Sequence, residues 1–109
     1  MNDPLAEKIR YNSLFDLYGN LLTDKQREYF GYYYSEDYSL SETAELLGVS
    51  RNAVHDQIKI VTGHLDEFES KLGLLERRGR LRVLASRLRT LDPGDGKLSA
   101  IADEIEKTE

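Results

Sequence analysis

Apolar side chains recur along this chain at the three- and four-residue spacing of an amphipathic helix. In the first segment this spacing connects Tyr11, Leu14, Phe15, Tyr18 and Leu22. Asp3 and Pro4 precede the segment, and an N-cap aspartate followed by proline is typical of a helix start. No segment shows the sustained alternation of a half-buried strand, and no Asn-Gly pair marks a hairpin. The pattern predicts an all-α fold, a helical bundle.

Two capping boxes mark the next helix starts. Thr23 with Gln26 forms the first box, and Ser39 with Glu42 forms the second. The first box predicts a helix from about residue 24 to about residue 34. The second predicts a short helix that ends at Gly48, because glycine readily adopts the left-handed conformation of a tight stop.

The fourth helix, capped by Ser50, is long. Its apolar positions follow one another at spacings of four and three residues and form a heptad-like seam of Val54, Ile58, Val61, Leu65, Phe68, Leu72 and Leu75. Gly73 permits a stop or a sharp bend near the end of the seam.

The stretch at about residues 39–62 has the spacing of a helix-turn-helix. The small Ala44 lies where the next helix crosses closely, Gly48 makes the turn, and Val49 fills the corner. Val54 then turns towards the core. We expect this core to cover only the first turns of the long seam. The rest of the seam needs other cover, which the leucine stripe of the next helix could give from the same chain or from a second copy; we expect a homodimer through these two helices.

The C-terminal part predicts two further helices. One apolar stripe consists of Leu81, Leu84, Leu88 and Leu91, and a shorter one of Leu98, Ile101, Ala102 and Ile105. Residues 92–96, Asp-Pro-Gly-Asp-Gly, form a turn or linker between them. We therefore divide the chain into a helix-turn-helix domain at residues 1–76 and an extension at residues 77–109. The extension contains an arginine-rich helix, a linker and a short acidic helix.

Several segments resemble known families. Residues 22–28, Leu-Thr-Asp-Lys-Gln-Arg-Glu, and residues 38–50, Tyr-Ser-Leu-Ser-Glu-Thr-Ala-Glu-Leu-Leu-Gly-Val-Ser, resemble the promoter-reading fourth region of bacterial sigma factors. The tyrosine-rich N-terminal helices, the Val-Ser-Arg-Asn-Ala-Val start of the fourth helix and the later Glu-Ser-Lys-Leu-Gly-Leu more closely resemble the YlxM-like family of helix-turn-helix proteins, over roughly residues 8–76. That family is encoded beside signal recognition particle components. The resemblance therefore implies a protein that regulates or assists that pathway and has those components as partners.

The fourth helix presents polar residues opposite its apolar seam. Arg51, Asn52, His55 and Lys59 would reach a major groove, where arginine can read guanine and asparagine can read adenine. Asp56 lies among them and would meet phosphate oxygens at a cost. Two interpretations stay open: a face that binds DNA or RNA, and a solvated polar face. The tyrosines at residues 29–38 are expected to be core residues with polar tips rather than a stacking platform for bases.

The net charge of −5 is unevenly distributed. Residues 1–76 carry 7 Lys and Arg against 14 Asp and Glu, whereas residues 77–91 carry six arginines and no acid. A strong nucleic-acid binder is usually basic over its whole footprint, which limits this interpretation. The arginines form a basic patch of Arg77, Arg78, Arg80, Arg82, Arg87 and Arg89. This patch could dock on the chain's own acidic domain, on RNA or on an acidic partner; a membrane surface is disfavoured because no aromatic anchor is present.

Composition narrows the remaining functions. The chain has no Cys, no apolar run long enough to cross a bilayer and no signal-peptide pattern at its start, which favours a cytoplasmic protein. We find no phosphate-binding loop, no nucleophile with a base, no metal cluster and no cofactor motif, so we expect a protein that is not an enzyme. The leading hypothesis is a nucleic-acid-binding helix-turn-helix regulator. The alternative is a protein- or ribonucleoprotein-interaction module that uses the helix-turn-helix as a scaffold.

Overall fold

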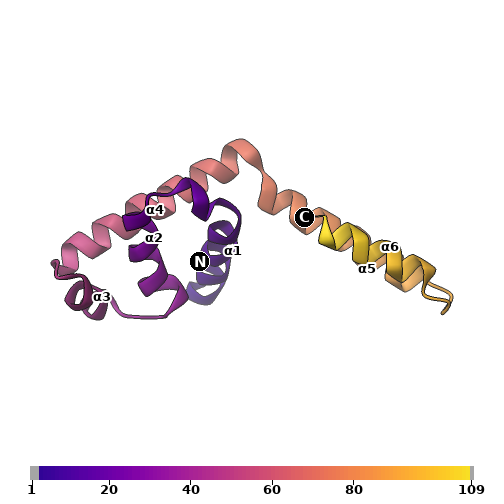
Figure 1. The fold of residues 1–109 in the computed structure, drawn as a ribbon, viewed down its shortest axis with the longest axis horizontal. Coiled ribbons are helices and arrows are strands. Elements are labelled where there is room, and N and C mark those ends of the chain that lie inside the picture. The colour runs from indigo at the N-terminus through magenta and orange to yellow at the C-terminus, as the bar shows by residue number, and fades with distance from the viewer. Residues whose placement is uncertain (1–2, 109) are drawn as a thin grey trace. The chain divides into compact units, whose positions relative to one another are not determined.

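A computed structural model describes residues 3–108, and within them the chain forms six α-helices and no strand (Figure 1). The predicted all-α fold is therefore confirmed. The chain divides into two compact units, the first ending at Leu72 and the second beginning at Gly73. The boundary predicted from the sequence, after residue 76, lies inside the helix that opens the second unit. No helix among the described residues is both long and apolar enough to cross a membrane.

The first unit is built around one long helix. It contains α1 (Pro4–Tyr18), a 3-10 turn (Gly19–Leu21), α2 (Asp24–Phe30), a π-helical turn (Gly31–Ser35), α3 (Leu40–Leu47) and α4 (Arg51–Leu72). Helices α1, α2 and α3 all pack against α4. Fully buried apolar side chains from three helices form the core: Leu14, Tyr18, Phe30, Val54, Val61 and Leu65.

The helix starts follow the predicted caps. The Asp3 side chain accepts a hydrogen bond from the Leu5 N–H, with Pro4 at the first helical position. Both capping boxes are complete, because the Thr23 and Ser39 hydroxyls and the side chains of Gln26 and Glu42 all accept backbone N–H groups. These local hydrogen bonds satisfy donors that the first helical turn would otherwise leave unpaired.

The second helix ends close to the predicted residue, but its last turn is not α-helical. Its α-helical part ends at Phe30, and a π-helical turn continues to Ser35, where the Glu36 N–H donates to the Gly31 carbonyl at 2.9 Å. The ring of Tyr34, at the end of this turn, stacks on Phe30 with centroids 4.8 Å apart. The helical period of the sequence could not predict this wider turn, because the turn depends on how the tyrosine rings pack in the core.

The apolar seam of α4 is buried only in part. Val54, Ile58, Val61 and Leu65 lie in the core, but Leu72 is 56% exposed. Gly73 adopts a left-handed φ of 63° and stops the helix, so Leu75 belongs to the next helix rather than to this seam. The prediction of one seam through Leu75 is therefore wrong at its end.

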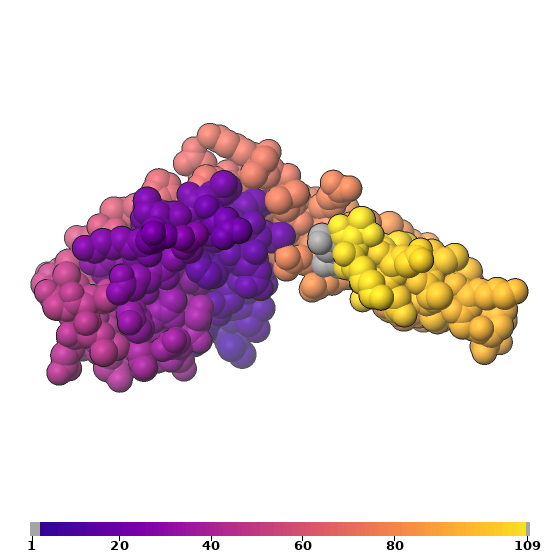
Figure 2. Space-filling view, in the orientation of Figure 1, coloured from indigo at the N-terminus to yellow at the C-terminus, as the bar shows by residue number. Residues whose placement is uncertain are grey.

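The second unit is a helical hairpin. Helix α5 (Leu74–Leu91) packs along α6 (Lys97–Lys107), and Figure 2 shows the yellow α6 lying on the orange α5. Ala85 of α5 and Ala102 of α6 are both fully buried, and small side chains allow two helix axes to approach closely. Leu84 and Leu91 stay outside this contact, at 47% and 71% exposure. The predicted leucine stripe is therefore not one buried face.

Candidate nucleic-acid interface

The turn between α3 and α4 fixes the start of the candidate interface. Gly48 is left-handed, with φ of 67°, and the Val49 N–H donates to the Ala44 carbonyl at 3.1 Å. The Ser50 hydroxyl accepts from the Ala53 N–H at 3.0 Å and caps α4. These contacts form the predicted helix-turn-helix and hold the first turns of α4 at the surface.

The first three turns of α4 carry the predicted contact residues. Arg51, Asn52, His55 and Lys59 are all exposed. They lie within about 12 Å along the helix axis, because an α-helix rises about 1.5 Å per residue. Asp56 is exposed beside them, and its carboxylate lies 3.6 Å from Nδ1 of His55. The face therefore offers donors for phosphates and bases, with one carboxylate that offsets part of its positive charge.

The first unit as a whole is acidic. Residues 1–72 carry 7 Lys and Arg against 13 Asp and Glu. Glu45 on α3 is exposed, and so is Glu67 further along α4. A nucleic acid would therefore contact a short basic strip rather than a broad basic surface.

Asp66, further along α4 than the candidate interface, is engaged by residues of α1. Its carboxylate accepts hydrogen bonds from Arg10 at 3.0 Å and from the Tyr11 hydroxyl at 2.7 Å. Burial, together with the hydrogen bond to Asp66, raises the pKa of Tyr11 to about 12, so the phenol stays protonated and keeps donating. These contacts hold α1 against α4, so this stretch of α4 stabilises the fold.

The structure divides the arginine patch between the two sides of α5. Arg89 donates to Asp103 at 2.8 Å and to Glu106 at 2.5 Å, both on α6. The hydrogen bond from Arg89, aided by the charge of Arg82, holds the pKa of the Glu106 carboxyl below its ordinary value. Arg78 is half-buried.

The other three arginines of the patch lie outside the contact with α6. Arg77, Arg80 and Arg87 are exposed, and Arg80 pairs with Glu76 on its own helix. The predicted acceptors of the patch did not include α6. The three-residue spacing of Asp103 and Glu106 on an amphipathic segment was the signal that could have identified it.

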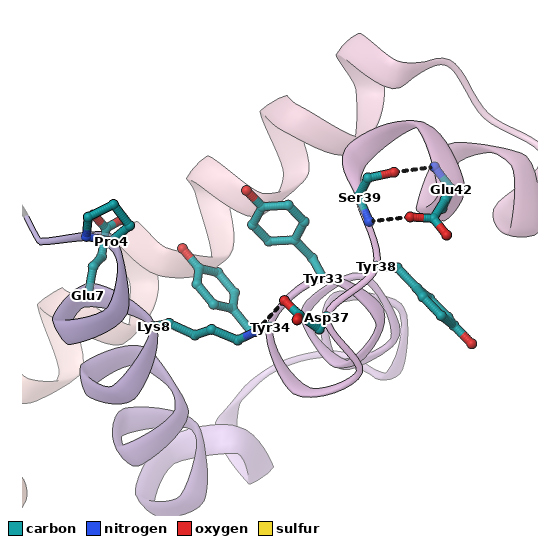
Figure 3. Close-up of a pocket in the computed structure, with 9 residues that line it drawn as sticks. All are labelled: Pro4, Glu7, Lys8, Tyr33, Tyr34, Asp37, Tyr38, Ser39 and Glu42. Atoms are coloured by element: carbon teal, nitrogen blue, oxygen red, sulfur yellow. Dashed lines mark hydrogen bonds and ion pairs between the residues drawn. The ribbon is translucent and has the colours of Figure 1, made fainter.

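An open groove of about 490 Å³ lies where α1, the π-helical turn and α3 meet (Figure 3). Lys8 is paired with Asp37 in it, and Ser39 and Glu42 are engaged in their capping box. Burial chiefly raises the pKa of Tyr34, one of its walls, to about 12. Since these polar groups already serve the fold, the groove does not add to the candidate interface.

The tyrosine-rich segment is mainly structural. Tyr29 and Tyr34 are buried, whereas Tyr32 and Tyr38 are half-buried and stack on each other with centroids 5.7 Å apart. The rings therefore pack among themselves, as expected for core residues with polar tips.

Comparison with known proteins identifies the family. A family model described as "UPF0122: Putative helix-turn-helix protein, YlxM / p13 like" matches residues 5–105. The chain is 44% identical over 106 residues to a UPF0122 protein of Shouchella clausii, covering 94% of this chain and 97% of that protein. It is 41% identical over 107 residues to one of Geobacillus kaustophilus, with the same coverage of 94% and 97%. A UPF0122 protein of Halalkalibacterium halodurans is 52% identical over 71 residues, covering 65% of each chain. With the helix-turn-helix geometry described above, these matches establish that the chain belongs to the UPF0122 family of YlxM/p13-like helix-turn-helix proteins.

Proposed function

We propose that this chain is a non-enzymatic nucleic-acid-binding protein that reads its ligand with the first three turns of α4. The observation that supports this proposal most directly is the exposure of Arg51, Asn52, His55 and Lys59 at the start of a firmly capped helix. Arginine and asparagine can each make paired hydrogen bonds to a base edge, whereas lysine contacts phosphates.

The wider role follows the family resemblance. We propose a cytoplasmic regulator connected with the signal recognition particle pathway, acting on DNA or on an RNA of that pathway. The narrow basic strip supports a modest, salt-sensitive affinity, because each phosphate contact releases counterions and the strip has few cations.

The test is a double variant, Arg51→Ala with Asn52→Ala, compared with wild type in a selection from randomised DNA and RNA duplexes. We expect the variant to lose its preference among sequences while keeping its melting temperature, because Ser50 still caps α4. Lys71→Ala is the matched control, since it removes a cation at the far end of the same helix. A variant with an unchanged sequence preference would exclude this face as the reader.

The charge distribution favours a second candidate function. Residues 1–72 carry almost twice as many acidic as basic residues, which suits a module that docks on a protein or a ribonucleoprotein. The salt dependence of binding separates the two functions. Phosphate contacts give a steep slope of log affinity against log salt, which Arg51→Ala should reduce by about one contact. An interface made with protein gives a shallow slope and survives nuclease treatment.

We also propose that the protein forms a homodimer through the C-terminal end of α4. Leu72 is exposed there, and Phe68 is only half-buried. Helix α5 contributes less than the sequence analysis expected, because α6 covers the side that carries Ala85.

A further inference from the structure

Helix α5 has two faces of similar composition, and one of them is covered. On the covered face Ala85 is fully buried against α6, and Leu81 and Leu88 are half-buried. Arg89 reaches across to two carboxylates of α6, at 2.8 Å from Asp103 and 2.5 Å from Glu106. This face thus holds an acidic amphipathic helix by combining apolar contacts with arginine–carboxylate pairs.

The face of α5 that adjoins the covered one is exposed to solvent. Its residues follow spacings of three, four, three and four, so they form one straight stripe along the helix. We call this the outer stripe; it consists of Arg77, Arg80, Leu84, Arg87 and Leu91. All five residues are exposed, Leu84 at 47% and Leu91 at 71%. Its length is about 21 Å at about 1.5 Å per residue, which matches several turns of a second helix.

We propose that the outer stripe docks an acidic amphipathic helix of a partner protein. The leucines would meet apolar residues at the same three- and four-residue spacing. Arg77 and Arg87 would pair with flanking carboxylates, whereas Arg80 is already paired with Glu76 on its own helix. The packing of α6 on the covered face shows that α5 can hold a helix of this kind. Arginine suits the role because its planar fork pairs with a carboxylate through two hydrogen bonds.

Other occupants fit the outer stripe less well. A sugar-phosphate backbone offers no apolar surface to Leu84 and Leu91, so RNA would use the arginines and leave the leucines exposed. A second copy packed stripe to stripe would bring three arginines against three arginines, and like charges at close range repel. A membrane surface normally needs aromatic side chains at the interface, and the stripe has none.

The test uses the full chain and fluorescence anisotropy with three labelled probes. The first probe is a stapled helical peptide with leucines at three- and four-residue spacing flanked by glutamates. The second has lysines in place of the glutamates, and the third is an RNA hairpin. The variants are Leu84→Ser with Leu91→Ser, and Arg77→Gln with Arg87→Gln. Val83→Ser is the matched control, because Val83 is 60% exposed on the same helix but outside the outer stripe.

We expect the wild-type chain and the Val83→Ser control to bind the glutamate peptide with the same micromolar affinity. Each double variant should weaken that binding by at least about tenfold, as expected when central anchors of a small interface are removed. The lysine peptide should not bind. The double variants should keep the wild-type melting temperature, because the outer stripe is solvated in the free protein.

Four results would overturn the proposal. The first is failure of the wild-type chain to bind the glutamate peptide, and the second is equal binding by the leucine variant. The third is stripe-dependent binding of the RNA hairpin in place of the peptide. The fourth is a lowered melting temperature or lost self-association in the leucine variant, which would mean that this chain or a second copy already covers the stripe. All four are independent of the α4 face, whose own variants test the proposed function separately.

Discussion

Gly48 and Gly63 illustrate how backbone conformation decides what a glycine contributes. Gly48 has φ of 67°, and a Cβ added there would meet nothing within 4 Å. Position 48 therefore needs glycine for its backbone conformation and not because space is lacking. Gly63 lies inside α4, also in open space but with ordinary helical geometry.

These conformations predict opposite effects of substitution. Gly48→Val should lower the free energy of unfolding by about 1–2 kcal/mol, because a β-branched side chain resists the left-handed region. Gly63→Ala should raise it by about 0.5–1 kcal/mol, because alanine restricts the unfolded chain and fits the helix. Urea denaturation measures both. An unchanged midpoint for Gly48→Val would contradict the assignment of a strained turn.

Thr43 provides a second prediction at the scale of a residue. Its side chain is fully buried in α3, and its hydroxyl has no hydrogen-bond partner. Thr43→Val replaces the hydroxyl with a methyl group of similar shape, so it should stabilise the domain by about 1 kcal/mol or more. Thr43→Ser is the control, because it keeps the hydroxyl and loses the methyl group; it should be less stable than wild type. Thermal unfolding measures the stability of both variants. A loss of stability in Thr43→Val would show that the Thr43 hydroxyl has a hydrogen-bond partner in solution.

Among the secondary-structure elements, the loop before α6 depends on Asp92. The carboxylate accepts backbone N–H groups from Ser99 at 2.9 Å, Gly94 at 2.7 Å and Gly96 at 3.2 Å. These hydrogen bonds, chiefly that from Ser99, lower the pKa of Asp92 from its ordinary 3.8 to about 2. A carboxyl with a lowered folded-state pKa stabilises the fold above its unfolded pKa, and the effect disappears as the pH falls through the folded value.

Asp92→Asn should therefore destabilise the α5–α6 hairpin in a pH-dependent way. At neutral pH, backbone N–H groups of α6 should exchange with solvent faster in the variant than in wild type. The reason is that the neutral side chain of asparagine offers one oxygen acceptor in place of the charged carboxylate. The difference should narrow as the pH falls from near 3.8 towards about 2, where the wild-type carboxyl itself becomes protonated. Glu104→Gln, an exposed substitution on the same helix, is the control. A difference that stays constant over this pH range would mean that the charge of Asp92 is not what holds the loop.

The oligomeric state belongs to the scale of the whole molecule. The 12.5-kDa chain leaves Leu72 56% exposed at the end of α4, and the proposed homodimer would bury it. Leu72→Ser should therefore shift sedimentation at micromolar concentration from dimer towards monomer, without lowering the helical content. The matched control is Leu46→Ser, since Leu46 is equally exposed, at 57%, but lies on α3. A wild-type protein that sediments as a monomer would exclude the dimer.

The sequence by itself determined the features that depend on neighbours a few residues away. The caps at Asp3, Thr23, Ser39 and Ser50, and the left-handed stop at Gly48, could be read directly because each is completed by hydrogen bonds within about one helical turn. The exposed face at the start of α4 also followed from periodicity, since residues opposite a buried seam must face solvent.

Only the tertiary structure decided features that depend on which surfaces meet. The leucines of α5 have one helical period, but packing against α6 buried Ala85 and left Leu84 and Leu91 exposed. The arginine patch was likewise divided by its contact with α6. Arg89 pairs with two carboxylates of that helix, and this pairing depends on how the two helices meet. A periodic pattern fixes which residues share a face, whereas the energy of packing that face depends on the shape and charge of its partner. That is why the elements could be predicted from local signals, and why the division of α5 into a covered face and a free one could not.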